Sequence, residues 1–276
     1  MLKKILFFFL LILVALPLSY AADVSIIYGD NSLWNKKEVA FAERRANGMK
    51  RHLNRVGFEV EVYSDKAFRK ALDKNCKTAN LILCQNPSKE FVFELKKFVA
   101  RGGKLCIFYS DSPALAKIMG IRVDKFIKPA GADEKWERIV FTWPRPILMP
   151  DDYAHELPSI MQLIPQADAK VLGNWVGTNG SKGPAGLVQT SNGFWVSLLP
   201  SEYANPTDYT MFVASIVGGT NSELWRSAAQ NLRKEIESTI PQKSVSALYE
   251  HYKNTPYPKL KQKMELLHKL NAEIDV

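Results

Sequence analysis

Short apolar runs alternate with longer amphipathic segments over residues 24–120, and this alternation limits the folds open to the chain more than any other feature. The segments between the runs have the spacing of amphipathic helices, and Gly57, Gly102 and Gly103 follow two of them. Apolar runs joined through helices predict a parallel sheet with right-handed crossovers. We therefore expect a doubly wound, mainly parallel α/β sheet. Its first strands are predicted at residues 24–29, 58–63, 81–84 and 105–109.

The pattern changes after Gly120. Residues 121–168 contain six prolines and one clear strand, at 138–141. This stretch therefore predicts a long excursion over the carboxyl edge of the sheet.

Regular elements return in the later part of the chain. Thr190-Ser191-Asn192-Gly193 separates two apolar runs, and its Asn-Gly pair favours a tight hairpin turn. A helix ended by Gly218 and Gly219 then completes the α/β domain, which we expect to span residues 22–219. The predicted elements are strands at 169–176, 185–189 and 194–199 and a helix at 207–217.

Residues 220–276 are predicted to form a helical C-terminal extension. One apolar stripe recurs there at helical spacing, and two further helical stretches follow Pro241. These helices have an apolar face to bury and no sheet of their own. They either pack back on the α/β domain or receive a partner, so an oligomer is one of the expectations. The stripe consists of Leu224, Trp225, Ala228, Ala229, Leu232 and Ile236.

The first residues have the pattern of a signal peptide. Two lysines precede an apolar run at 5–18, which is shorter than the roughly 20 residues that a membrane-spanning helix needs. Small residues at Ser19 and Ala21 then form a cleavage site. We expect residues 1–21 to be removed after Ala21, leaving a periplasmic or secreted protein with no stable membrane anchor. The alternative is an uncleaved anchor.

The formal net charge of +9 does not by itself indicate a nucleic-acid partner. Two of the positive charges belong to the signal peptide, and the others alternate with acidic residues along amphipathic segments. This arrangement is typical of a solvated surface, and we expect no nucleic acid partner. A weak attraction to an acidic polysaccharide or to a membrane surface stays open.

The three cysteines do not form a disulfide scaffold pattern. Cys84 and Cys106 lie in apolar runs that predict neighbouring core strands, and Cys76 lies in a polar connection. We expect buried free thiols, with a bridge between Cys84 and Cys106 as the lesser alternative. The four histidines lack the spacing of metal ligands, so we expect neither a metal nor a cofactor.

Three stretches resemble the class I glutamine amidotransferase-like fold, which is flavodoxin-like. They are GGKLCIFYSDS at 102–112, AKVLGNWVGTNGSKGPAGLVQTSNGFWVSLLPSE at 169–202, and NSELWRSAAQNL at 221–232. More narrowly, they resemble the version found at the start of exported bacterial glycosyl hydrolase-like proteins, and a related sheet occurs in the trimerisation domain of β-galactosidases. The resemblance implies a domain that precedes a catalytic barrel, so a glycosyl hydrolase-like barrel is an implied partner.

The resemblance also implies where amidotransferase chemistry would lie. It places the nucleophile elbow at Ser110, with Phe108 and Ser112 where the family has glycines. Leu199 stands about where the family has its histidine, and Glu202 is near the position of the acid. A serine without a neighbouring base cannot lose its proton near neutral pH. We therefore expect a degenerate site with no catalytic residue.

Polar residues follow the predicted strands at the edge where open α/β sheets bind ligands. Amide and carboxylate groups beside aromatic rings suit the hydroxyls and C–H faces of a sugar. The competing interpretation is that these residues only end strands and cap helices. Trp34, Trp143 and Trp175 could lie at the rim of such a site, although core packing is the favoured role. The candidate ligand-binding residues are Asp30, Asn31, Gln85, Asn86, Ser110 and Asp111.

Together these features predict an exported, non-catalytic amidotransferase-like module with an accessory, ligand-binding or assembly role in polysaccharide processing. One alternative is a glycoside or ester hydrolase that uses carboxylates at the sheet edge, such as Asp30 and Asp111. Another is a purely structural oligomerisation domain.

Overall fold

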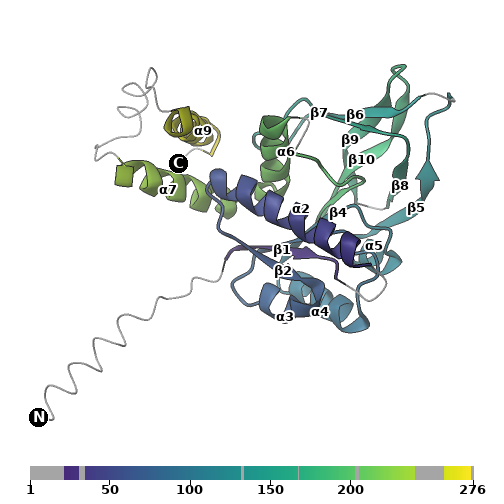
Figure 1. The fold of residues 1–276 in the computed structure, drawn as a ribbon, viewed down its shortest axis with the longest axis horizontal. Helices are drawn as coiled ribbons and strands as arrows, with labels where there is room; N and C mark the ends of the chain where they lie inside the picture. The colour runs from purple at the N-terminus through teal and green to yellow at the C-terminus, as the bar shows by residue number, and fades with distance from the viewer. Residues whose placement is uncertain are drawn as a thin grey trace, which may run out of the picture.

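The computed structural model of the protein describes residues 22–30, 35–131, 134–166, 168–202, 205–239 and 258–274 (Figure 1). The predicted signal peptide, Asn31 and Trp34 lie outside the described residues. In the part that is described, no helix combines the length and the apolarity needed to cross a membrane.

The strands form one sheet of eleven strands, in the order β2-β1-β3-β4-β11-β10-β9-β6-β7. Strand β8 pairs with β10 and with β5 outside this path. The strands are β1 (Val24–Tyr28), β2 (Val60–Ser64), β3 (Thr78–Ile82), β4 (Lys104–Phe108), β5 (Ile121–Ile127), β6 (Trp136–Phe141), β7 (Asp152–Leu157), β8 (Ile160–Pro165), β9 (Lys170–Gly177), β10 (Lys182–Thr190) and β11 (Gly193–Val196).

Helices cover both faces of one half of the sheet. Helices α2 and α6 lie on one face, and α3, α4 and α5 lie on the other (Figure 1). Each face buries its own hydrophobic cluster. The helices are α2 (Lys36–Arg55), the 3₁₀ turn η1 (Asp65–Ala67), α3 (Phe68–Ala71), α4 (Lys89–Ala100), α5 (Pro113–Met119), α6 (Pro206–Gly218), α7 (Ser222–Thr239) and α9 (Pro258–Ile274).

The half of the sheet between the helices is parallel. Strands β2, β1, β3, β4 and β11 pair in parallel, in that order. With β11 as the fifth strand, this is the flavodoxin-like order 2-1-3-4-5. The predicted doubly wound α/β fold is therefore confirmed. In such a sheet, the strand order reverses between β1 and β3, and ligands bind at the carboxyl ends beside that point.

The other half of the sheet is antiparallel. Strand β11 turns back into β10 through the predicted hairpin, and β9, β6, β7, β8 and β5 continue with antiparallel pairs. The prediction of a single strand in residues 121–168 is wrong, because four strands, β5 to β8, form there. The prolines that obscured these strands lie in the turns between them or, like Pro165, at a strand end.

The helical extension packs back on the α/β domain through α7. All six residues of its predicted stripe are buried. The Trp225 ring lies 5.0 Å from the Phe58 ring, and a Cβ at Gly57 would meet the Ala228 carbonyl oxygen at 2.3 Å. Helix α9 packs on α7 with Met264, Leu267 and Leu270 buried. Residues 240–257, where a further predicted helical stretch falls, lie outside the described residues.

Candidate ligand site at the carboxyl edge

The corner after β4 is built around Tyr109. Its backbone is left-handed, with φ 55°, which is uncommon and strained for a residue with a large side chain. The resemblance placed the elbow at Ser110, but this conformation lies one residue earlier. A phenol therefore occupies the corner, and its ring lies 6.2 Å from the ring of Phe126 on β5.

Ser110 is buried and serves the turn. Its Oγ donates to the Cys84 carbonyl oxygen at 2.8 Å and accepts from the Ser112 backbone N–H at 3.2 Å. Because a hydroxyl carries one proton, this proton is committed to a carbonyl group. Ser112 in turn accepts from the Leu115 N–H at the start of α5. The two serines thus hold the loop and the helix start.

Gln85 joins the loops that follow β3 and β4. Its Nε2 donates to the Tyr109 carbonyl oxygen at 3.2 Å, and its Oε1 accepts from the Asp111 N–H at 2.7 Å. The side chain of Gln85 therefore fixes the backbone on both sides of Ser110. Asp111 and Asn86 are exposed at this edge. The structure thus brings together three of the predicted residues, namely Gln85, Ser110 and Asp111.

Asp30 belongs to a separate cluster at the end of β1. Its carboxylate lies 3.0 Å from Lys66 Nζ, and its backbone N–H donates to the buried Asp65 carboxyl at 3.1 Å. Burial is the main cause that raises the pKa of Asp65 above its ordinary value. Asp30 therefore ties β1 to the turn that follows β2.

Two tryptophans considered for the rim have different positions. Trp175 is fully buried, and its Nε1 donates to Ser197 Oγ at 2.8 Å, which confirms core packing. Trp143 is 78% exposed, so core packing is wrong for this residue. It lies on the β6–β7 loop, with the Arg145 guanidinium 4.4 Å from the centre of its ring.

The cysteines offer no reactive thiolate. All three are buried and free, so the expectation of buried free thiols is confirmed and the alternative bridge between Cys84 and Cys106 is wrong. Burial raises the pKa of Cys76 to about 11, and it raises the pKa of Cys84 and of Cys106 further. Among the residues described, no group of three or more His, Cys, Asp or Glu side chains could hold a metal ion.

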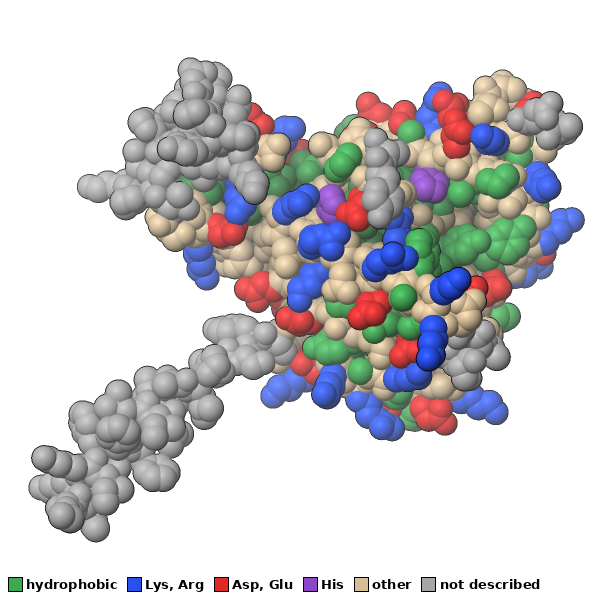
Figure 2. Space-filling model, in the orientation of Figure 1, with side chains coloured by type: hydrophobic (Ala, Val, Ile, Leu, Met, Phe, Trp, Pro, Cys, Tyr) green, Lys and Arg blue, Asp and Glu red, His purple; other side chains and the backbone are tan. Residues whose placement is uncertain are grey.

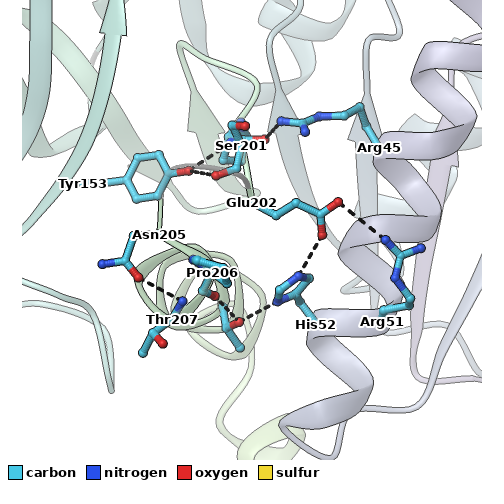
Figure 3. A network of polar contacts seen from close by, with 11 residues as sticks. Arg45, Arg51, His52, Tyr153, Ser201, Glu202, Asn205, Pro206 and Thr207 are labelled. Atoms are coloured by element: carbon cyan, nitrogen blue, oxygen red, sulfur yellow. Dashed lines mark hydrogen bonds and ion pairs between the residues drawn. The ribbon is translucent and has the colours of Figure 1, made fainter.

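A buried polar network around His52, which the sequence analysis missed, lies between α2, α6 and the loop after β11 (Figure 3). His52 Nε2 lies 2.8 Å from Glu202 Oε2, and His52 Nδ1 lies 2.6 Å from Thr210 Oγ1. Arg51 Nη2 lies 3.5 Å from the second Glu202 oxygen. Glu202 and Thr210 lie 150 and 158 residues from His52 in sequence, so no local motif indicates the network.

Burial lowers the pKa of His52 although the hydrogen bond to Glu202 opposes this shift. The two ring nitrogens of His52 thus contact the Glu202 carboxylate and the Thr210 hydroxyl oxygen. The Thr210 hydroxyl donates its single proton to the Pro206 carbonyl oxygen at 2.6 Å. His52 is thus paired inside the protein and not directed at the Tyr109 corner.

Two further contacts hold the loop after β11 in place. The Tyr153 hydroxyl donates to the Ser201 carbonyl oxygen and accepts from the Ser201 N–H, both at 2.9 Å (Figure 3). Burial raises the pKa of Tyr153 to about 12, so this hydroxyl stays protonated. Arg45 donates to the Pro200 carbonyl oxygen. The segment that carries Glu202 is thereby attached to α2 and β7 as well as to α6.

No protein-family model matches this chain, and no curated protein matches it in sequence. Solved structures match it in fold, among them the following three. A ThuA-like protein from Bacteroides uniformis has 15% identity and a TM-score of 0.51, over 70% of this chain and 89% of that one. α-L-Fucosidase isoenzyme 2 from Paenibacillus thiaminolyticus has 12% identity and a TM-score of 0.50, over 72% and 33%. An exo-β-1,4-mannosidase from an Opitutaceae bacterium has 13% identity and a TM-score of 0.50, over 71% and 36%.

At these identities the likeness concerns the fold alone. This chain spans about a third of the length of each of the two glycosidases. In coarse terms, the neighbours and the strand order fit the flavodoxin-like sheet of the amidotransferase-like fold.

Proposed function

We propose that this protein is an exported, non-catalytic binding module of polysaccharide processing, with its ligand site at the Tyr109 corner. One observation carries the proposal. The strained corner, where amidotransferase-like enzymes have their nucleophile, presents a tyrosine, and the neighbouring Ser110 gives its proton to the Cys84 carbonyl. Neither group can form an attacking atom near neutral pH, because burial also raises the pKa of Tyr109.

The side chains at this corner suit a sugar. The Tyr109 ring and the half-exposed Phe126 ring offer apolar faces for sugar C–H groups. The exposed Asp111 carboxylate beside them accepts hydrogen bonds from sugar hydroxyls. Sites of this kind combine aromatic surface with a few placed polar groups.

The solved structures with a similar fold support the proposed role in polysaccharide processing. An α-L-fucosidase and an exo-β-1,4-mannosidase contain this fold within about a third of their length. On this basis, we place the module beside a glycoside-cleaving partner, such as a glycosyl hydrolase-like barrel. The proposal includes export directed by residues 1–21.

A thermal-shift screen against mono- and oligosaccharides tests the proposal. A bound sugar stabilises the native state in proportion to the logarithm of its concentration over its dissociation constant. We expect Tyr109→Ala and Asp111→Asn each to reduce this stabilisation. Loss of the Tyr109 ring, on which the sugar stacks, should lower the affinity for the sugar by about tenfold. Trp143→Ala is the matched control, because Trp143 is an exposed aromatic on the distant β6–β7 loop.

Three results would contradict the proposal. A flat screen would remove the sugar site. Turnover of a chromogenic glycoside or ester that Asp30→Asn or Asp111→Asn abolishes would make the chain a hydrolase. An oligomer in light scattering that becomes monomeric on truncation at Gly219, together with a flat screen, would favour a structural oligomerisation domain.

A further inference from the structure

The positive charge of the chain is concentrated in one segment. Residues 65–104 contain ten lysines and arginines but only four acidic residues. This segment therefore carries a charge of +6 out of the formal +9 of the whole chain. It forms η1, α3, β3, α4 and the turns between them.

Helices α3 and α4 present these charges on one side of the molecule. The two helices are packed together, with the Phe68 and Phe91 rings 5.3 Å apart, and Arg101 donates to the Leu72 and Asp73 carbonyl oxygens at 2.6 and 2.5 Å. Figure 2 shows blue side chains gathered at the lower end, over the position of α3 and α4 in Figure 1. We define the α3–α4 face by its exposed residues Lys66, Arg69, Lys70, Lys74, Lys89, Phe93, Lys96, Lys97 and Arg101.

The acidic residues of the segment do little to offset this face. Asp65 is buried. Asp73 accepts hydrogen bonds from the Asn75 and Cys76 N–H groups, and Glu94 pairs with Lys97 at 2.9 Å. Glu90 is exposed on α4, three positions before Phe93. Eight basic side chains against Glu90 and Glu94 still leave this face with a net positive charge, so it keeps a positive potential.

A large apolar side chain lies among these charges. Helix α4 buries Phe91, Leu95 and Phe98, while Phe93 is 57% exposed on the opposite side. Lys89, Lys96 and Lys97 lie four, three and four positions from Phe93, so they share its side of the helix. The Lys97 Nζ lies 4.4 Å from the centre of the Phe93 ring.

We propose that the α3–α4 face binds the anionic surface of a lipid bilayer. Lysines and arginines around an exposed aromatic ring are the pattern of peripheral membrane contacts, in which cations meet lipid headgroups and the ring enters the boundary of the acyl chains. An anionic bilayer offers a negative surface and an apolar layer beneath it. A soluble polyanion offers the charge without that layer, so it leaves Phe93 in water.

The proposal is separate from the sugar site. The α3–α4 face includes none of the residues of the Tyr109 corner. Each basic residue near an anionic membrane strengthens binding by about fivefold. Several of the eight basic residues must therefore act together for measurable binding.

Vesicle sedimentation of the chain from Ala22 onward tests the proposal. We expect binding to vesicles of phosphatidylglycerol and phosphatidylcholine, a decrease with added salt, and no binding to phosphatidylcholine alone. Lys89→Glu with Lys96→Glu should weaken binding by at least about tenfold. Phe93→Ser should weaken it by about fivefold and leave the salt dependence unchanged.

The control is Lys170→Glu with Lys182→Glu, which makes the same change in net charge at exposed positions of β9 and β10. This variant should bind as the parent chain does.

Equal loss of vesicle binding in both double variants would overturn the proposal, because net charge alone would explain binding. Absence of binding to anionic vesicles at low salt would overturn it as well. Binding to soluble polygalacturonate but not to vesicles would assign the face to an acidic polysaccharide instead. Unchanged thermal melting of all variants checks that they fold.

Discussion

The Tyr109 corner shows what a sequence can and cannot reveal about single residues. The stretch around it predicts a strand, a turn and a helix, and all three are present. The position of the strained residue was not predictable, because tyrosine has no preference for the left-handed region and tertiary contacts impose it. Gln85 was chosen only for its place after a strand, yet its side chain makes the bonds that hold the corner.

The burial of His52 makes stability depend on pH. Its pKa is below the ordinary value of 6.5, so below about pH 6.5 the unfolded chain takes up a proton more readily than the folded chain. The free energy of unfolding should therefore fall as the pH decreases from about 8 to about 5.5. Urea denaturation at several pH values measures this slope. Burial also lowers the pKa of His155, so His155 contributes to the pH dependence of stability in the same direction.

His52→Gln should reduce this pH dependence, because glutamine can still donate to Glu202 but does not titrate. His268→Gln is the control at an exposed histidine. If the His52 variant keeps the full slope, His52 is not the group that titrates.

At the scale of elements, the hairpin between β10 and β11 was predictable and most of the antiparallel half was not. Asn192-Gly193 marks the hairpin within four residues of sequence. Strand β5 pairs with β8, and β6 with β9, across more than 30 residues of sequence, and the registers of β5, β6 and β7 contain irregularities. Sequence periodicity alone could not resolve them.

Gly193 has a second role that the turn motif does not reveal. Its φ is 131°, and a Cβ there would lie 1.9 Å from the Leu105 carbonyl oxygen of β4. Gly193→Ala should therefore destabilise the protein by more than about 3 kcal/mol, since both the backbone and the sheet must shift. Gly180→Ala is the matched control. Gly180 also has a positive φ, 79°, but its Cβ would meet nothing within 4 Å, so about 1 kcal/mol is expected. Chemical denaturation measures the free energy of unfolding of both variants, and an equal loss in Gly193→Ala and Gly180→Ala would contradict the steric argument.

The contact between α7 and the sheet domain can be tested with a pair of tryptophans. Trp225 is 1% exposed and packs on Phe58, whereas Trp143 is 78% exposed. Trp225→Ala should cost about 3–5 kcal/mol of unfolding free energy, and Trp143→Ala about 0.5 kcal/mol or less. Chemical denaturation of both variants measures the difference. A small loss for Trp225→Ala would mean that α7 is not an integral part of the fold.

At the scale of the whole molecule, β1 to β4 and their helices follow from the alternation of the first 120 residues, and the antiparallel half of the sheet does not. The net charge was similarly misleading when taken over the whole chain. We expected basic residues to alternate with acidic residues along the chain. This expectation overlooks residues 65–104, where the excess of basic residues is concentrated. Only the packing of α3 beside α4 shows that these residues share one face.

The place of β11 in the sheet has a consequence for biosynthesis. Strand β11 pairs with β4, although Gly193 and Leu105 are separated by 87 intervening residues. A ribosome must therefore add these 87 residues after Leu105 before the fifth parallel strand can be inserted. Until then β4 keeps an open edge, and the nascent chain cannot complete its parallel sheet.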